Sequence, residues 1–296
     1  MPTNITTKRD IVKPLQYVEE GTTAATFGVI PSSPTFTAAG VNVEINTDPR
    51  TAYERINALG TEDIVNSVKT GEAYGFTLKS NIFNSTFAKY GISAVGGTGT
   101  IGASLTFVFS RNIDGTEYFT KMVGCRPMST TLSVARGPWE LDMTWLAQEI
   151  QDETTTGITG ATFVTAPPTT APWTHSDSGA NPLTWNSVAY PERRFSTTIT
   201  RDLALLEVNG QVLIQFSKAA NRAISFSADV YKKDTTLLTD YYDHTSRSAS
   251  YVVKSATSTI TYTNARLTDV NERHAGSDFT GEIIAITGLS ENVSIT

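Results

Sequence analysis

The run Ile224-Ser225-Phe226-Ser227-Ala228-Asp229-Val230 alternates between apolar and polar residues over its whole length. A period of two places successive side chains on opposite faces of a β-strand, so one face can enter a core while the other meets solvent or a neighbour. The same alternation recurs in four other runs: 41–45, 74–79, 140–145 and 195–200. Threonine is abundant in the chain, and its branched β-carbon suits a pleated surface. The sequence therefore predicts a mainly β protein.

The alternating runs form two similar cycles. In each cycle strand-like runs surround one helix-like stretch, at 83–90 in the first and at 235–242 in the second. This repeated order predicts a duplicated small domain, with a pattern in common and almost no residue identity. We expect four parts in the 296 residues: an N-terminal arm at 1–34, a first domain at 35–150, a linker at 151–181 and a second domain at 182–296.

The arm and the linker lack the periodicity of a packed element. Residues 1–34 are polar and include Pro14, Pro31 and Pro34, and the linker combines prolines and glycines with a Thr154-Thr155-Thr156 run. Proline and glycine disfavour both helix and central strand. We expect an extended arm that becomes ordered on a neighbouring molecule, and an extended linker.

Two dipeptides are typical of tight hairpin turns. Asn209-Gly210 separates the apolar-rich runs 205–208 and 211–214, and Asp114-Gly115 separates another pair of strand-like runs. A primed two-residue turn needs positive φ at both central positions, which Asn, Asp and Gly tolerate best. The sheet is therefore expected to be antiparallel.

Charge and cysteine content restrict the possible partners. The formal net charge of −6 argues against a protein that holds nucleic acid by neutralising phosphates. Cys125 is the only cysteine, so no intrachain disulfide can form and a buried free thiol is expected. No run approaches the ~20 apolar residues of a membrane span. We expect a soluble protein that is made in the cytoplasm and has no membrane partner.

Motifs of enzyme and metal sites lack the context that their chemistry requires. Gly97-Thr98-Gly99-Thr100-Ile101-Gly102 matches a dinucleotide-binding string, but a helix-like stretch precedes it and a strand-like run follows it. His175, His244 and His274 lie far apart, without a second ligand at metal spacing. The acidic and aromatic segment 240–244 is expected to form a solvated helix end. We expect neither catalysis nor a bound cofactor or metal.

Two other function classes stay open at this stage. Trp139, Trp145, Trp173 and Trp185 could form a carbohydrate-binding platform on a cell-surface β-sandwich, although Trp145 and Trp185 fit core positions better. A glycan-processing enzyme would need two carboxylates about 5–10 Å apart in one cleft, which a sequence alone does not display.

Three segments, taken in their order along the chain, carry a resemblance to a known family. They are Tyr17-Val18-Glu19-Glu20-Gly21-Thr22-Thr23, continuing to Gly28 and Pro31; Leu132-Ser133-Val134-Ala135-Arg136-Gly137-Pro138-Trp139-Glu140-Leu141; and Leu183-Thr184-Trp185-Asn186-Ser187-Val188 with the run 195–201. In this order they resemble the tail tube, or major tail, proteins of long-tailed, siphovirus-like bacteriophages.

The resemblance implies two tandem β-sandwich or partial-barrel domains, each with one flanking helix, that assemble into a ring-wide β-barrel. It implies stacked rings, either trimeric and pseudo-hexameric or hexameric. The implied partners are the tape-measure protein in the lumen, tail terminator and baseplate or distal tail proteins at the ends, and DNA that passes without being held. The implied location is the virion tail, assembled in the host cytoplasm. A tail terminator or distal tail protein of related fold is the nearest alternative.

Polar faces of the best strands supply candidate residues for the tube lumen. A conduit for DNA should present few cations, since each phosphate contact slows sliding. The candidates are Glu44, Asn46, Glu140, Asp142, Thr144, Ser225, Ser227 and Asp229.

Segments without a core-facing stripe supply candidates for contacts between rings. Order in such segments must come from neighbouring molecules. The candidates are Tyr17, Val18, Glu19 and Glu20 in the arm, and Gly97 and Gly99 in the glycine-rich loop.

Overall fold

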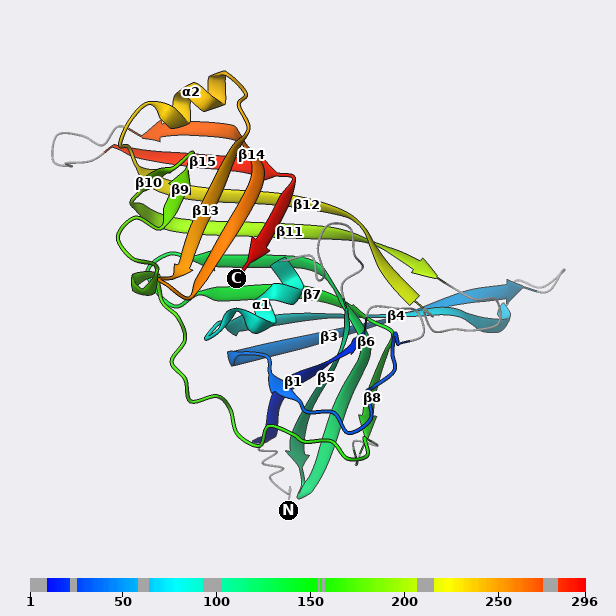
Figure 1. The fold of residues 1–296 in the computed structure, drawn as a ribbon. Coiled ribbons are helices and arrows are strands. Elements are labelled where there is room, and N and C mark those ends of the chain that lie inside the picture. The colour runs from blue at the N-terminus through cyan, green and yellow to red at the C-terminus, as the bar shows by residue number, and fades with distance from the viewer. Residues whose placement is uncertain are drawn as a thin grey trace, which may run out of the picture.

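The computed structural model describes residues 10–21, 26–57, 64–92, 103–153, 155, 158–206, 216–273 and 282–296. These residues form sixteen strands that join into one antiparallel sheet, with two α-helices and one short 3-10 helix (Figure 1). The prediction of a mainly β, antiparallel protein is confirmed.

The first half of the chain contains eight strands and one helix. In chain order they are β1 Asp10–Gly21, β2 Thr37–Ala38, β3 Val41–Asn57, β4 Ile64–Asn81, α1 Ser85–Ile92, β5 Ser104–Ile113, β6 Thr116–Val134, β7 Glu140–Ala147 and β8 Glu149–Glu153. A long irregular segment then leads to the 3-10 helix η1, His175–Ser178.

The second half repeats this composition. Its elements are β9 Leu183–Trp185, β10 Val188–Tyr190, β11 Glu192–Leu206, β12 Phe216–Tyr231, α2 Thr236–Tyr242, β13 Arg247–Lys254, β14 Ser258–Arg273, β15 Ile283–Ser290 and β16 Asn292–Ile295. Both helices start beside a polar side chain that accepts a backbone N–H: Asn84 Oδ1 from Thr86 at 3.0 Å, and Asp234 Oδ1 from Thr236 at 2.9 Å.

The strand pairings of the two halves are the same. In the first half β3 pairs with β4, β4 with β7, β7 with β6, β6 with β5 and β8, and β1 with β5 and β2. Each pair recurs in the second half between the strands whose numbers are higher by eight. For example, β11 pairs with β12, β14 with β16 and β9 with β10. The two halves therefore have one topology.

Irregularities in the ladders align the halves residue by residue. The β6–β7 register breaks between Pro127 and Ser129, and the β14–β15 register breaks between Leu267 and Asp269. A β-bulge inserts one extra residue and bends its strand. Because the breaks coincide in the topology, Ser129 of β6 corresponds to Asp269 of β14.

One hydrophobic core runs through both halves. Phe76, Phe107 and Trp145 pack together in the first half, with the rings of Phe107 and Trp145 edge to face at 4.9 Å between centroids. Trp185 and Phe226 occupy the second half. Cys125 is a buried free thiol, as expected, and burial raises its pKa.

Several local expectations require correction. α1 begins and ends two residues after the expected bounds, whereas α2 begins one residue late and ends where expected. Residues 10–21 of the expected arm form β1, where Leu15 and Tyr17 are buried. Periodicity missed this strand because Pro14 and the irregular register with β5 interrupt it. The expected linker includes residues 151–153 of β8 at its start and η1 near its end.

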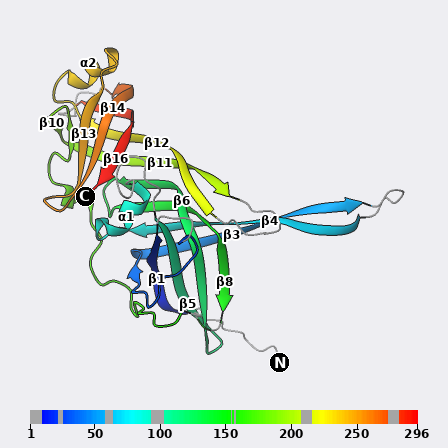
Figure 2. The same ribbon diagram turned by 45° about the vertical axis from the view of Figure 1, so that its right-hand side comes forward.

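Turn expectations fall partly outside the described residues. Asp114 and Gly115 have positive φ values of 52° and 85° between β5 and β6, as a primed turn requires. Asn209-Gly210 lies outside the described residues, and β11 and β12 on either side of it pair antiparallel. Figures 1 and 2 show the ribbon of β3 and β4 reaching well beyond the body of the sheet.

Candidate subunit interface

The two halves of the sheet meet at β6 and β11. Residues 129–134 pair with residues 195–200, from Ser129 opposite Thr200 to Val134 opposite Phe195. The hydroxyls of Thr131 and Thr198 lie 3.1 Å apart and share a hydrogen bond. This junction produces a continuous layer in the order β3-β4-β7-β6-β11-β12-β15-β14 (Figure 1).

Trp139 packs against the junction of β6 and β11 from its core side. It lies in the connection between β6 and β7 and is fully buried. Its ring centroid is 5.5 Å from that of Tyr251 and 6.2 Å from that of Phe195, both in edge-to-face geometry. The backbone N–H of Trp139 also donates to the carbonyl of Trp173 at 2.8 Å. The connection after β6 is therefore inserted into the second half.

Each end of this layer, in the described part of the chain, is a strand edge with no strand beside it. β3 pairs with β4 on one side, and residues 269–273 of β14 pair with β15 on one side. An open edge presents a row of backbone donors and acceptors to which another chain can pair. By the alignment above, these edges are the counterparts of β11 and β6. The two open edges of the layer, those of β3 and β14, are therefore equivalent to the edges of β11 and β6 that pair at its centre.

The predicted lumen residues lie on one face of this layer. Residues directly opposite each other in neighbouring strands point to the same side of a sheet. Glu44, Lys79, Asp142, Thr131, Thr198 and Ser225 form one row across the layer. Asn46 and Thr144 belong to a second row, and Glu140 and Ser227 belong to a third. Asp229 lies beside Arg194 on the same face.

The face is not purely acidic or neutral: the strand register places Arg50 and Arg273 on it, and two cations with described side chains also lie on it. Lys79 Nζ is 3.8 Å from Asp142 Oδ2, and Arg194 Nε is 2.7 Å from Asp229 Oδ2. Each of these two cations is thus paired with one of the predicted acidic residues. Glu140, Asp142 and Glu44 are exposed, whereas Asp229 is largely buried beneath Arg194.

The residues predicted to contact other rings divide into three groups. Tyr17 is a core residue, 4% exposed, and Glu20 is buried as well, so neither presents a surface contact. Glu20 instead accepts hydrogen bonds from the N–H groups of Gly28 and Gly124 and from Thr106 Oγ1. Glu19 is exposed and Val18 is half-buried. Gly97 and Gly99 lie outside the described residues.

An apolar groove of about 360 Å³ opens beside the start of β3. β1, β3, β5 and the segment after β8 all contribute to it. Its lining includes Ile11, Val12, Leu15, Val43, Ile45, Phe109, Pro167 and Pro168. Ile11 is 66% exposed and Val12 is 40% exposed. Contiguous exposed apolar surface of this kind is typical of a contact site.

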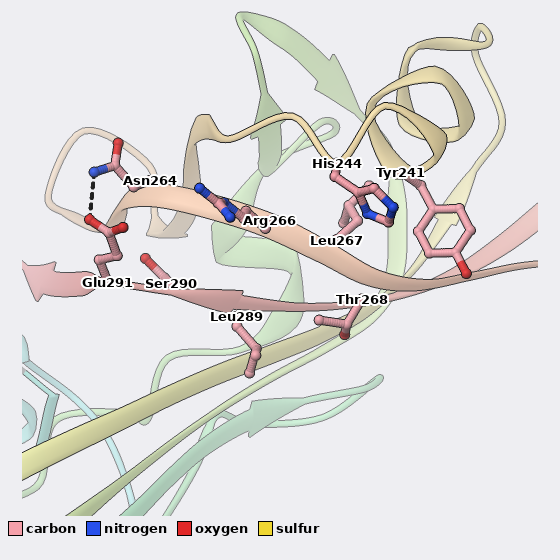
Figure 3. A pocket seen from close by; sticks show the side chains of 9 residues that line it. All are labelled: Tyr241, His244, Asn264, Arg266, Leu267, Thr268, Leu289, Ser290 and Glu291. Atoms are coloured by element: carbon pink, nitrogen blue, oxygen red, sulfur yellow. Dashed lines mark hydrogen bonds between the residues drawn. The ribbon is translucent and has the colours of Figure 1, made fainter.

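A second groove, of about 610 Å³, lies between the end of α2, β14 and β15 (Figure 3). Tyr241 and His244 line one side, and Leu289, which is 52% exposed, lines the other. Asn264 Nδ2 donates to Glu291 Oε2 at 2.6 Å across its end (Figure 3). The groove follows β14 through its bulge, next to the open edge.

The first half fills the place that corresponds to this second groove. Asn264 and Arg266 correspond to Gly124 and Arg126. There the Phe27 ring lies against Gly124, where a Cβ would come within 3.0 Å, and Arg126 lies over the ring at 5.7 Å. The second half has the two-residue turn Asn186-Ser187 where the first has residues 22–36. Lacking that insertion, the second half leaves its groove open.

Two polar clusters tie elements together inside the second half. His175 Nε2 lies 2.6 Å from Glu192 Oε1, and the Tyr251 hydroxyl donates to the same oxygen. Burial raises the pKa of Glu192. Asp240 accepts from Trp185 Nε1 at 2.9 Å and from Arg247 at 2.7 and 3.0 Å. Asp240 is therefore a buried ion-pair partner, and the expectation of a wholly solvated helix end was wrong at this residue.

The sequence model of one protein family, described as phage tail tube protein, matches residues 14–294. The chain belongs to this family. A search of curated proteins found no match. The match spans both halves of the sheet, so the repeated topology and the junction between β6 and β11 lie within the tail tube region.

Membership of the tail tube family gives the observed surfaces a context. The family is a structural one whose members build the virion tail and assemble with themselves and with other tail components. In the described part of the chain no helix is long and apolar enough to cross a membrane, and no cluster of metal-ligand side chains is found there. All four tryptophans are buried, so none offers a ring face to a glycan as a surface platform would.

Sequence reasoning missed the role of Trp139. A signal was present, because Gly137-Pro138-Trp139 forms part of a segment that resembles the family. Nothing local in that segment indicates that its tryptophan packs against residues more than fifty positions away. The alternation patterns also did not reveal that the predicted polar rows join across the halves.

Proposed function

We propose that this tail tube protein polymerises as stacked rings into the conduit through which phage DNA is ejected. One observation carries the proposal. The chain joins its own halves through the edges of β6 and β11, and it leaves the corresponding edges of β14 and β3 open at its two ends. The contact made within one chain can therefore be repeated between chains.

Repetition of the internal junction predicts the register between copies. Ser129 lies opposite Thr200, Thr131 opposite Thr198 and Ser133 opposite Ser196 within the chain. Transferred to the open edges, this register places Asp269 of one copy opposite Arg50 of the next. It likewise places Asn271 opposite Asp48 and Arg273 opposite Asn46. Pairing of this kind removes exposed edges by closing a ring.

We propose a ring of three chains. Each chain supplies two units of one topology, so three chains supply six units in a pseudo-hexameric arrangement. A head-to-tail contact between unlike edges closes into a ring when its rotation permits, which suits an interface that joins β14 to β3. The first unit would then begin at β1, because β1 is part of its sheet, and the second at β9.

The polar face of the layer is our candidate for the lumen. Glu44, Glu140 and Asp142 are exposed there, and Lys79 and Arg194 on that face are each engaged in an ion pair. A surface with acidic and neutral groups repels phosphates and lets DNA slide. The opposite face forms the core and cannot line a channel.

The remaining parts of the proposal concern partners and place of assembly. The tape-measure protein would fill the lumen before DNA does, and tail terminator and distal tail proteins would bind the two ends. Assembly would take place in the host cytoplasm, and the protein would have no catalytic role. Residues 1–9, Val18, Glu19 and the segment around Gly97 and Gly99 are candidates for contacts between rings.

Negative-stain electron microscopy of the purified protein tests this proposal. Stacked rings or tubes with a central channel are expected as the protein is concentrated. Isolated rings that never stack would indicate a terminator or distal tail role instead. A protein that stays monomeric at all concentrations would refute the proposal.

A further inference from the structure

The apolar groove beside β3 is the counterpart of the surface that Trp139 fills within the chain. Ser129 and Asp269 are equivalent residues of the two halves. From them, cross-strand partners can be followed to Asn46 in β3 and to Ser196 in β11. Asn46 is therefore equivalent to Ser196, and Ile45 to Phe195. Ile45 lines the groove, and Phe195 contacts Trp139.

A second and a third strand support the same alignment. The β5–β6 register breaks between Leu105 and Phe107, and the β13–β14 register breaks between Arg247 and Ala249. This aligns Phe109, which lines the groove, with Tyr251, the other aromatic partner of Trp139. In β1 and β9 the pairings likewise align Leu15 with Leu183.

The difference between the two surfaces is that one is covered. Leu183, Phe195 and Tyr251 are at most 1% exposed, and Trp139 lies against the rings of Phe195 and Tyr251. Ile11 and Val12 remain exposed beside the groove, and Val43 and Ile45 are only half-buried. The covering element follows β6, so its counterpart follows β14.

The connection between β14 and β15 spans residues 274–282 and contains one aromatic residue, Phe279. β14 is also the strand whose open edge matches that of β3. A copy paired through β14 to β3 of its neighbour therefore brings this connection to the neighbour's groove. Asn42 is the only polar residue among the groove's lining, which favours an aromatic occupant over a charged one.

We propose that the connection between β14 and β15 of a second copy docks in this groove, with Phe279 in the place that Trp139 takes within the chain. The inference rests on the ring proposed above and names the segment that holds its copies together. The groove is thus a subunit docking site, filled only on assembly.

Substitutions on both sides of the contact test the proposal. Phe279→Ser and Ile11→Asp should each raise the protein concentration needed for tube formation roughly tenfold or more, as loss of a central interface side chain does. Tyr242→Ser and Val29→Asp are matched controls, because Tyr242 is 72% and Val29 54% exposed outside the groove. Circular dichroism and thermal unfolding of unassembled chains should show that all four variants fold.

Cross-linking tests the position of the contact. Ile45→Cys combined with Phe279→Cys should give, under oxidising conditions, covalent dimers and trimers on a denaturing gel. Each single variant should give none beyond the wild-type background, since Cys125 is buried.

The outcomes separate this inference from the ring itself. Tubes formed by wild type, with neither cross-linking nor an assembly defect in Phe279→Ser, would overturn the docking site and leave the ring intact. Failure of the wild-type protein to form rings or tubes would overturn both.

Discussion

Trp139 of the first half packs edge-on against Tyr251 of the second, with ring centroids 5.5 Å apart and ring planes at 79°. This contact lies behind the β6–β11 ladder and supports it from the core side. The two halves are therefore one packed unit. A ring built from such chains needs to form only one kind of contact, that between β14 and β3.

Trp139→Ala should weaken the internal junction. Removal of a fully buried tryptophan is expected to cost about 3–5 kcal/mol of unfolding free energy, through lost burial and the cavity that remains. Urea unfolding of the unassembled chain measures this, with Trp139→Phe as the conservative control that should lose less. A loss below about 1 kcal/mol for the alanine variant would show that the junction tolerates repacking.

Charge reversal at the proposed contact between β14 of one copy and β3 of the next should weaken assembly, and restoring opposite charges at residues that the register places opposite each other should reverse the effect. Asp269→Lys would place like charges opposite Arg50 and weaken assembly, because cross-strand charge pairs contribute about 0.2–1 kcal/mol each and recur at every seam of a tube. Arg50→Glu should do the same, and the double variant should recover assembly. Light scattering against protein concentration measures the effect. No recovery in the double variant would place the two residues apart.

Cations introduced on the proposed lumen face should leave tube assembly intact and impair DNA delivery. Glu140→Lys with Asp142→Lys should leave tubes intact, since both side chains are exposed, and should reduce DNA delivery by assembled phage particles because lysines hold phosphates. Infectivity per assembled particle is the readout. Asp243→Lys with Asp114→Lys, at exposed turn positions, is the control with equal charge change. Equal infectivity of the two double variants would remove the lumen assignment.

Truncation at the N-terminus should have two distinct effects. Deletion of residues 2–30 removes β1 with its buried Leu15 and Tyr17, so the chain should fail to fold. Deletion of residues 2–9 leaves β1 in place and should yield a folded subunit. Circular dichroism distinguishes the two, and microscopy of the shorter deletion shows whether residues 2–9 act in stacking. A folded chain after the longer deletion would contradict the place of β1 in the sheet.

The ion pair of Asp240 should make stability depend on acidity. Hydrogen bonds from Arg247 hold the pKa of Asp240 below its ordinary value of 3.8. A carboxyl group with a lowered folded-state pKa stabilises fully above the unfolded-state pKa, and this stabilisation is lost as pH falls through the folded-state pKa. Asp240→Asn should therefore lower the free energy of unfolding near neutral pH, and lower it less in acid, where the wild-type carboxyl group is protonated as well.

Unfolding curves near neutral pH and in strong acid measure the effect at Asp240. Asp243→Asn is the matched control, since Asp243 is the exposed residue at the end of the same helix. A constant difference between Asp240→Asn and wild type at all pH values would show that the ion pair is not its source.

The sequence alone determined the class of the fold and which residues share a strand face. Alternation at 224–230 and 140–145 is local, and a period of two assigns faces without knowledge of neighbours. Positive φ at Asp114 and Gly115 follows from the same kind of local chemistry. The order of strands and helices along the chain is local too, so the two cycles could be recognised before any pairing was known.

Only the tertiary structure decided which strands pair and what each face meets. Ser129 and Thr200 are neighbours because of a register set by packing over distant residues, which no local pattern encodes. Tyr17 illustrates the limit: it lies in a proline-containing polar segment, yet a strand partner and three aromatic rings bury it. β3 and β14 have open edges because the pairing that joins β6 to β11 is not repeated at the ends of the layer within one chain. The groove beside β3 is open for the same reason. Alternation assigns a residue to a face, whereas burial and an open edge depend on contacts between residues distant in sequence.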